Sequence, residues 1–519
     1  MCGIAAAFRC EGAAKRVEAM LGLLRHRGDQ DDPILSLPPR TALGTRRLKI
    51  LDRKRAIQPM WSFDGRFAVV LNGQIYNFRQ LRHELSINGA AFHTDSDTEV
   101  VANALALWGP SAIERFRGMF AFVAIDYLDQ SLIAARDPFG IKPLYFSRSG
   151  EGLLFASEIS ALLKGSTNAI LEEVRPGHIL TDGVLQPYTP RVEGQLGCDN
   201  SLSLNARYLY RLLHRAVKER LPDRLPCAVF FSGGIDSTLV LHAARRFNRK
   251  TRAYLVSNLD GRDRPYALEY ADATDSDLVI VGFNSEDVLT LIPEIVRTTE
   301  SFEPNMIRNG AFSTLLAKRV HMDGIRVALC GEGADELFCG YPEIAHQGSA
   351  GKVRELRQVF LSDLYRTQLQ RVDRCSMAHS VETRVPFLDL ELTAFSDSLP
   401  TSHLVSRDQS NVTDKAVLRQ IYLEEPTLRA LSIGKREKVV LVDGAGMGDN
   451  SRSGPFFEYA EQTVSDTEFQ RMKSGFPGLQ FSSKEEVMYF QILDSHLDLR
   501  RVPFLAKRPH VNATSTTMT

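Results

Sequence analysis

The chain has 519 residues, too many for one hydrophobic core, so two domains of roughly 200–300 residues are expected. With 44% hydrophobic residues, the composition is that of an ordinary globular protein. The 63 basic and 63 acidic residues cancel, which excludes a global field that would attract nucleic acid or an anionic membrane.

The first domain, residues 2–190, is expected to be mainly β-structure with a few helices. A helix is predicted over about 98–108, because Ser96 and Asp97 can cap its first turn. Residues 191–205 are polar and aperiodic and are expected to form a linker. Strands are predicted where apolar runs alternate with turn-rich segments, at residues 67–71, 119–125, 131–135 and 152–156.

The second domain is expected over residues 206–505, where the hydrophobic period becomes helical from Ala206 to Val217. Strands alternating with helices predict a parallel α/β sheet here. The polar tail, residues 506–519, is expected to be disordered. The predicted strands are residues 227–231, 252–257, 277–281 and 325–330.

The cysteines and the apolar runs bear on the compartment. Seven cysteines are scattered without a CxxC pair or a spaced metal framework, which is typical of reduced thiols and predicts a cytoplasmic protein. No run approaches 18 apolar residues, and no signal-peptide pattern opens the chain. We therefore expect neither secretion nor membrane spanning.

The heptapeptide SGGIDST follows a predicted strand and opens a helix. Its two glycines allow a sharp turn, and the N–H groups that follow favour a phosphate. Asp236 would repel that phosphate unless a cation lay between them, which suggests Mg²⁺. A capped strand–helix turn without function is the alternative. The candidate phosphate-binding and metal-binding residues here are Ser232, Gly233, Gly234, Asp236, Ser237 and Thr238.

A second loop, GEGADE, follows a later strand and carries three carboxylates within five residues. Ligands of open α/β sheets bind at the carboxyl ends of the strands. Because clustered carboxylates repel one another, a metal ion or an amine is their natural partner. A solvated acidic turn is the alternative.

These loops, with SVETRVPFLD, occur in the order of the synthetase half of the asparagine synthetases, and the chain resembles that family. MCGI, LRHRGD, TRRLKILD, LNGQIYN, DSDTEV, GMFAF, RDPFGIKPLYF and FASEISALL resemble its glutamine-hydrolysing half. The resemblance implies an α+β N-terminal-nucleophile domain, an αββα sandwich. It also implies that an α/β parallel-sheet domain of the ATP-pyrophosphatase, adenine nucleotide α-hydrolase-like type follows.

The resemblance makes Cys2 the nucleophile of a glutamine amidotransferase. A thiol with a pKa of about 8.5 is only slightly ionised at neutral pH, but removal of Met1 would free an α-amino group to accept its proton. By the same resemblance, the Asn72 amide and the Gly73 N–H form the oxyanion hole. Arg47 and Asp97 bind the α-carboxylate and α-ammonium of glutamine. A buried structural cysteine is the alternative.

In the second half, the resemblance assigns Mg²⁺ to Asp236 and Asp335 beside ATP. Lys438, in KVVLVDGAG, is expected to stabilise charge on pyrophosphate or on an acyl-adenylate. The remaining implied residues are Phe231 and Val256 beside the adenine, Gly331 in the second loop, Glu332 near the acceptor and ammonia, and Arg308 and Glu336 near the phosphates and the acceptor.

The chain departs from the family pattern at several positions. Gln74 stands where the family usually has glutamate, which predicts a weaker grip on the substrate ammonium. Thr45 replaces a histidine, and RHRGD lacks the usual proline. Near the expected acceptor site, PNMIR replaces a threonine-rich stretch and Cys330 replaces a serine.

The implied enzyme activates a carboxylic acid, aspartate by default, as an acyl-adenylate and amidates it with ammonia that crosses an internal channel from the glutaminase site. The products are asparagine, AMP, pyrophosphate and glutamate. The same chemistry on another acid stays open, as does an adenylating cyclase like the β-lactam synthetases. Glutamine, ATP, Mg²⁺ and the acceptor are the expected partners, without nucleic acid or membrane, and a homodimer is left open.

Overall fold

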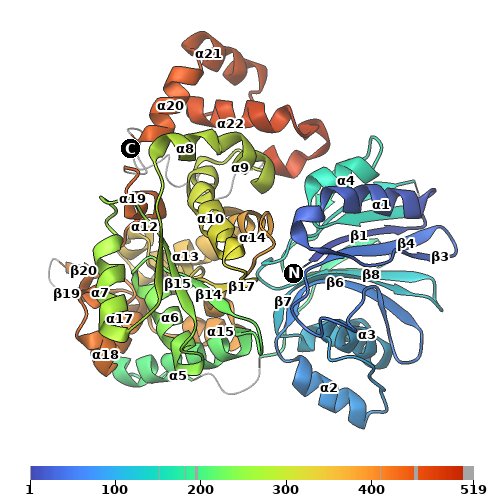
Figure 1. Cartoon of the computed structure of the whole chain (residues 1–519), viewed down its shortest axis with the longest axis horizontal. Helices are drawn as coiled ribbons and strands as arrows, with labels where there is room; N and C mark the ends of the chain where they lie inside the picture. Colours follow the sequence, from blue (N-terminus) through green and yellow to red (C-terminus); the bar gives the residue numbers. More distant parts are fainter. Residues whose placement is uncertain are drawn as a thin grey trace. The chain divides into compact units, whose positions relative to one another are not determined.

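The computed structural model describes residues 2–150, 152–181, 183–192, 197–408, 411–448 and 454–506 (Figure 1). Met1, part of the expected linker and nearly all of the expected tail lie outside these residues. The chain forms two compact units. Unit 1 runs to Arg191 and also includes Met377–Ser380 and Gln491–Lys507, whereas unit 2 includes Val192–Ser376 and Val381–Phe490.

Unit 1 contains two antiparallel sheets, with the strand orders β11-β9-β10-β1-β4-β2 and β13-β12-β8-β7-β6-β5; β3 also pairs with β4. The first sheet consists of β1 (Cys2–Phe8), β2 (Gln30–Asp31), β3 (Leu35–Leu37), β4 (Thr41–Arg47), β9 (Tyr145–Ser149), β10 (Gly152–Ala156) and β11 (Leu171–Glu173). The second consists of β5 (Met60–Trp61), β6 (Phe67–Ile75), β7 (Gly118–Asp126), β8 (Ser131–Arg136), β12 (His178–Thr181) and β13 (Val184–Pro187).

Helices cover the outer faces of these sheets (Figure 1). One apolar core lies between the two sheets, and a second core lies between the second sheet and its helices. The four layers form the predicted αββα sandwich. The first sheet carries α1 (Ala13–Leu23) and α4 (Ile159–Gly165), and the second carries α2 (Phe78–Ile87) and α3 (Asp97–Trp108).

Unit 2 is built on a five-stranded parallel sheet with the order β16-β15-β14-β17-β18, so the predicted parallel sheet is confirmed. The fifth strand was not predicted, because its three residues, ETR, carry no apolar run. The strands are β14 (Cys227–Phe230), β15 (Arg252–Val256), β16 (Leu278–Val281), β17 (Val327–Leu329) and β18 (Glu382–Arg384).

The first helix of unit 2, α5 (Leu202–Arg220), begins before the predicted Ala206, because the Ser201 hydroxyl caps it by accepting from the Leu204 N–H. The next helices of unit 2 in chain order are α6 (Ile235–Phe247), α7 (Arg264–Thr274), α8 (Ser285–Thr290), α9 (Ile292–Thr299), α10 (Pro304–Met322), α11 (Ala334–Phe338), α12 (Pro342–Ala345), α13 (Ala350–Leu364), α14 (Gln370–Met377) and α15 (Leu390–Ser398).

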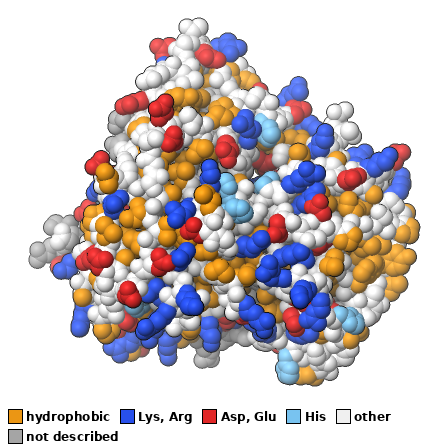
Figure 2. All heavy atoms as spheres, in the orientation of Figure 1, with side chains coloured by type: hydrophobic (Ala, Val, Ile, Leu, Met, Phe, Trp, Pro, Cys, Tyr) orange, Lys and Arg blue, Asp and Glu red, His pale blue; other side chains and the backbone are white. Residues whose placement is uncertain are grey.

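The remaining α-helices and strands in the described part of the chain are α16 (Thr401–Leu404), a hairpin of β19 (Ser406–Asp408) and β20 (Asn411–Thr413), α17 (Ala416–Glu424), α18 (Pro426–Arg429), α19 (Leu441–Ala445), α20 (Pro455–Thr463), α21 (Asp466–Gly475) and α22 (Lys484–Asp494). No helix in the described part of the chain carries an apolar stretch of the length that a bilayer requires. Basic and acidic side chains are interspersed on the face in Figure 2, as their equal numbers lead one to expect.

The last described segment belongs to unit 1, although it follows unit 2 in the sequence. Phe504 stacks on Tyr145 of β9, with ring centroids 5.7 Å apart. The Arg501 guanidinium donates to the carbonyl oxygens of Ala169 and Ser166, at 3.0 and 3.1 Å. Unit 1 is therefore completed by residues from the far end of the chain.

Candidate active sites

Cys2, the candidate nucleophile of unit 1, is the first residue of β1 and is buried. Sheet register places Cys2 opposite Arg47 of β4. The Cys2 N–H donates to Asn72 Oδ1 at 3.1 Å, and its carbonyl oxygen accepts from the buried Arg27 guanidinium at 3.2 Å. Burial raises the pKa of the Cys2 thiol, while the Leu48 N–H and the Arg47 charge oppose that shift. The thiol therefore needs a base to reach its reactive form.

The two residues expected to form the oxyanion hole lie next to each other on β6. Asn72 uses Oδ1 to hold Cys2, whereas its Nδ2 is buried and has no hydrogen-bond partner among the described residues. Gly73 has φ +145°, and a Cβ there would lie 2.0 Å from the Met119 carbonyl oxygen, so only glycine fits. A buried donor without a partner, fixed beside a thiol, is the arrangement that an oxyanion hole requires.

The residues expected to bind the α-groups of glutamine already have partners within the protein. Arg47 Nε lies 2.9 Å from Asp32 Oδ2, and both side chains are buried. Asp97 Oδ2 accepts from the Ile75 N–H at 2.9 Å, which ties the start of α3 to the end of β6. Gln74 is buried on the same strand. The side chains of Arg47 and Asp97 are therefore already positioned by the protein itself.

Two features of unit 1 go beyond the expected site. Thr45, which replaces the family's histidine, donates its hydroxyl to the Gly3 carbonyl oxygen at 3.2 Å and so ties β4 to β1 beside the nucleophile. Asp32 also accepts from the Gln58 N–H at 3.0 Å. Sequence reasoning missed Asp32, because it lies in a polar stretch, GDQDDP, that reads as an ordinary turn.

In unit 2, the SGGIDST turn joins β14 to α6. Gly233 has φ +63°, and a Cβ there would lie 2.8 Å from a backbone nitrogen of α7. The Ser232 and Ser237 hydroxyls are 3.1 Å apart, and Ser237 also accepts from the Ser232 N–H. Thr238 is buried and donates to the Gly234 carbonyl oxygen at 2.7 Å. The serines therefore shape the turn, while the threonine hydroxyl closes the first turn of α6.

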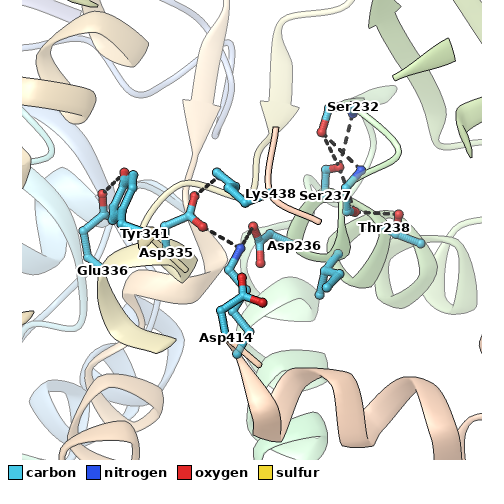
Figure 3. Close-up of polar contacts among 12 residues, drawn as sticks. Ser232, Asp236, Ser237, Thr238, Asp335, Glu336, Tyr341, Asp414 and Lys438 are labelled. Carbon is cyan, nitrogen blue, oxygen red and sulfur yellow. Dashed lines mark hydrogen bonds and ion pairs between the residues drawn. The ribbon is translucent and has the colours of Figure 1, made fainter. Parts of the chain in front are cut away.

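Asp236 and Asp335 approach the same lysine nitrogen (Figure 3). Lys415 Nζ lies 2.5 Å from Asp236 Oδ2 and 2.5 Å from Asp335 Oδ1. Lys438 also pairs with Asp335. Burial raises the pKa of Asp236; for Asp335 the two lysines outweigh burial and hold its pKa well below its usual range. Sequence reasoning missed Lys415, since DKAVLRQ reads as the start of an ordinary amphipathic helix.

The side chains of Asp236 and Asp335 are suited to provide two of the ligands of a magnesium ion. Asp236 Oδ1 is buried and has no hydrogen-bond partner among the described residues. In the described part of the chain, no group of three or more His, Cys, Asp or Glu side chains could hold a metal ion. Mg²⁺ is commonly bound through one or two carboxylates together with substrate phosphates. Asp236 and Asp335 therefore fit a metal that arrives with a nucleotide.

A cavity of about 200 Å³ opens beside these carboxylates. Burial and the negative charge of Asp335 raise the pKa of Glu336 to about 7, and the Tyr341 hydroxyl donates to Glu336 at 2.7 Å. The cavity brings together residues from separate predicted motifs. The residues of those motifs that line it are Phe231, Ser232, Asp236, Ser237, Val256, Gly331, Glu332, Asp335, Glu336 and Lys438.

Arg308 is not among the residues that line this cavity. Its guanidinium pairs with the buried Glu485, with Nε 2.8 Å from Oε1. Arg371 of α14 lines the cavity instead and donates to Ser313 Oγ at 2.6 Å and to Glu332 Oε1 at 3.1 Å. Its Nε is buried and has no hydrogen-bond partner among the described residues. A buried guanidinium of this kind suits a carboxylate ligand.

Family models match both halves of the chain. The glutamine amidotransferase domain matches residues 1–181, and asparagine synthase matches residues 208–352 and 345–502. Glutamine-hydrolysing asparagine synthetase 3 of Arabidopsis thaliana is 30% identical over 514 residues, which cover 95% of this chain and 87% of that protein. The glutamine-hydrolysing asparagine synthetase of Triphysaria versicolor is 30% identical over 525 residues, with 95% and 86% covered.

A more distant relative, a probable glutamine-hydrolysing asparagine synthetase of Dictyostelium discoideum, is 28% identical over 95% of this chain and 93% of its own length. Among solved structures, a glutamine phosphoribosylpyrophosphate amidotransferase from B. subtilis aligns over 54% of this chain and 66% of that chain, at 19% identity. Its TM-score of 0.32 is too low to support an argument.

Proposed function

Because the chain belongs to the family of glutamine-hydrolysing asparagine synthetases, which are carbon–nitrogen ligases, we propose that it amidates aspartate with ammonia from glutamine while ATP is cleaved to AMP and pyrophosphate. The observation that carries the proposal is the Asn72 side chain. Its oxygen holds the nitrogen of Cys2, and its buried Nδ2 has no partner among the described residues.

In unit 1, the proposed reaction begins once Met1 is removed and the nitrogen of Cys2 becomes a free amine. That amine takes the thiol proton, and the thiolate attacks the side-chain amide carbon of glutamine. Asn72 Nδ2 and the Gly73 N–H donate to the oxygen of the tetrahedral intermediate. The amine returns its proton to the leaving nitrogen, ammonia departs, and water hydrolyses the thioester to glutamate.

In unit 2, the proposed reaction begins when the acceptor carboxylate attacks the α-phosphorus of ATP and pyrophosphate leaves. Asp236 and Asp335 would hold Mg²⁺, which supplies charge neutralisation at the phosphates when it is bound. Lys438 adds a positive charge on the same side of the cavity. Ammonia then attacks the acyl carbon of the adenylate, AMP leaves, and the amide is formed.

Arg371 is the proposed anchor for a second carboxylate of the acceptor. It lines the cavity, is buried, and has an N–H without a partner among the described residues. An α-carboxylate of aspartate would fit this group, which supports aspartate as the default acceptor.

The seven cysteines are all free, which supports the proposed cytoplasmic setting.

The proposal is tested by product analysis. The purified protein is incubated with glutamine, ATP, MgCl₂ and a panel of carboxylic acids, and the products are identified by mass spectrometry. We expect asparagine, glutamate, AMP and pyrophosphate in equal amounts with aspartate. An amide of another acid, with none from aspartate, would establish a different acceptor. An internal amide formed without glutamine consumption would establish the cyclase alternative.

A further inference from the structure

Lys415 occupies the place between two carboxylates where a cation of the nucleotide complex is expected. We propose that Lys415 is a built-in counter-ion that aligns Asp236 with Asp335 and prevents a divalent cation from binding there until nucleotide phosphates arrive. This inference rests on the proposed function, since it treats both aspartates as metal-binding residues. It makes Lys415 a positioning residue and assigns it a role in the order of binding.

The geometry places a single ammonium group between the two carboxylates. Lys415 Nζ is 2.5 Å from an oxygen of each aspartate, and the residue is only 3% exposed. One aspartate comes from the first turn of α6 and the other from α11, so the ammonium joins two loops that follow separate strands. Without this cation, two buried carboxylates would face each other at high cost.

The backbone around Lys415 is arranged to deliver the side chain to this position. Lys415 precedes α17 with φ +50°, an uncommon conformation for a residue other than glycine, and its N–H donates to the Phe338 carbonyl oxygen at 3.2 Å. Gly340 leaves the necessary room. A Cβ on Gly340 would lie 2.2 Å from Lys415 Cε and 2.1 Å from Asp335 Oδ1.

The balance between the negative and positive charges of this cluster explains why a divalent cation is excluded when no nucleotide is present. The two carboxylates face two ammonium groups, because Lys438 also pairs with Asp335. A divalent cation that entered this balanced set would meet two positive charges in a buried setting, where they are weakly screened. A triphosphate brings several negative charges, to which the lysines can turn, and the carboxylates then become available to the metal.

The experiment measures metal binding without nucleotide. Mn²⁺ is titrated into the full-length wild-type protein and into Lys415→Met, and bound metal is followed by calorimetry and electron paramagnetic resonance. We expect Lys415→Met to bind Mn²⁺ about tenfold or more tightly than the wild type. We also expect its melting temperature to be lower without metal and to recover when Mn²⁺ is added. A merely structural lysine would not produce this gain.

Two further variants make the outcome decisive. Lys435→Met removes an exposed lysine from the same region and should bind Mn²⁺ as the wild type does. Adding Asp236→Asn to Lys415→Met should abolish the gained binding. A circular dichroism spectrum like that of the wild type, with a cooperative melting transition, shows whether each variant is folded, and Lys415→Gln replaces any variant that is not.

Equal Mn²⁺ affinity in the wild type and the folded Lys415 variant would overturn the inference, and so would a gain that survives Asp236→Asn. Failure of the proposed function has a different signature. In that case the wild type makes no AMP with any acid in the product assay, whatever the Mn²⁺ titration shows. The two results are therefore distinguishable.

Discussion

The two candidate sites are built in different ways. In unit 1, sheet register places Cys2 opposite Arg47, and a hydrogen bond joins Cys2 to Asn72 of the facing sheet. Arg47 is held in turn by its ion pair with Asp32. In unit 2, loops that follow parallel strands bring Asp236 to Lys415, and the site is held by opposite charges. A substitution in the first site should therefore alter one chemical step, whereas a substitution in the second should also alter which ions bind.

The largest expected effect tests whether the two sites act separately. Cys2→Ala removes the nucleophile, so glutamine-dependent synthesis should fall to background, while synthesis from added ammonium salt should continue near the wild-type rate. Both rates are measured by asparagine formation. Intact mass should show that the active wild type begins at Cys2. Loss of the ammonia-dependent reaction in the variant would contradict the separation of the sites.

The next effect concerns the charges in unit 2. Asp236→Asn leaves two lysines facing one carboxylate, so acceptor-dependent pyrophosphate release should fall about 100-fold while glutaminase activity persists. Asp414→Asn is the matched control, because Asp414 pairs with Arg419, and it should retain pyrophosphate release. A nearly unchanged rate in Asp236→Asn would remove this residue from the proposed magnesium site.

A smaller effect is expected in the glutamine pocket. Gln74→Glu restores the family's carboxylate beside the substrate ammonium, a charge-assisted contact worth about 1–2 kcal/mol. The Michaelis constant for glutamine should fall about 5- to 30-fold. The Michaelis constant for ATP serves as the control and should not change. A higher value for glutamine would show that this pocket is adapted to a neutral side chain.

The smallest effect concerns the scaffold of unit 2. Burial lowers the pKa of His214 to about 4, with help from the Arg246 and His242 charges. The unfolded chain takes up this proton below a pH of about 6.5, so the stability contribution is full above that pH and is lost between 6.5 and 4.

His214→Phe keeps the aromatic contacts with Tyr210 and Phe247 and removes this proton. Unfolding free energy should therefore fall less with acid in the variant, by about 1–2 kcal/mol, since His214 is partly exposed. Denaturant unfolding at pH 7 and pH 4.5 measures the difference. An equal acid loss in both proteins would show that this histidine does not titrate with the fold.

The elements that could be predicted from the sequence are those with a local sequence pattern, such as an apolar run or a short motif. Apolar runs predicted four of the five strands of the unit 2 sheet, and SGGIDST marked the turn after β14 whose residues line the cavity. The αββα sandwich followed from the family resemblance, because strand runs alone do not say which sheets face each other. The short strand ETR was not predicted, because its polar residues gain their partners only in the folded sheet.

The side chains that sequence reasoning missed depend on long-range contacts. Lys415 and Asp236 form an ion pair although they lie 179 positions apart in the sequence, and the residues around either one do not predict the contact. Arg436, in a basic run that reads as a solvated surface, donates to the Ser232 carbonyl oxygen at 3.1 Å. The Arg308 guanidinium likewise pairs with Glu485, which lies 177 positions later in the sequence.

Because the last described segment of the chain belongs to unit 1, unit 1 is completed only after unit 2 has been synthesised. Both sheets of unit 1 have been synthesised by residue 187, but Phe504 and Arg501 emerge only after unit 2 has been made. Until then, the ring of Tyr145 and the carbonyl oxygens of Ala169 and Ser166 lack their final partners. A chain that terminates early therefore lacks the ring that stacks on Tyr145 and the guanidinium that holds two carbonyl oxygens, and an incompletely packed unit of this kind is open to chaperones and proteases.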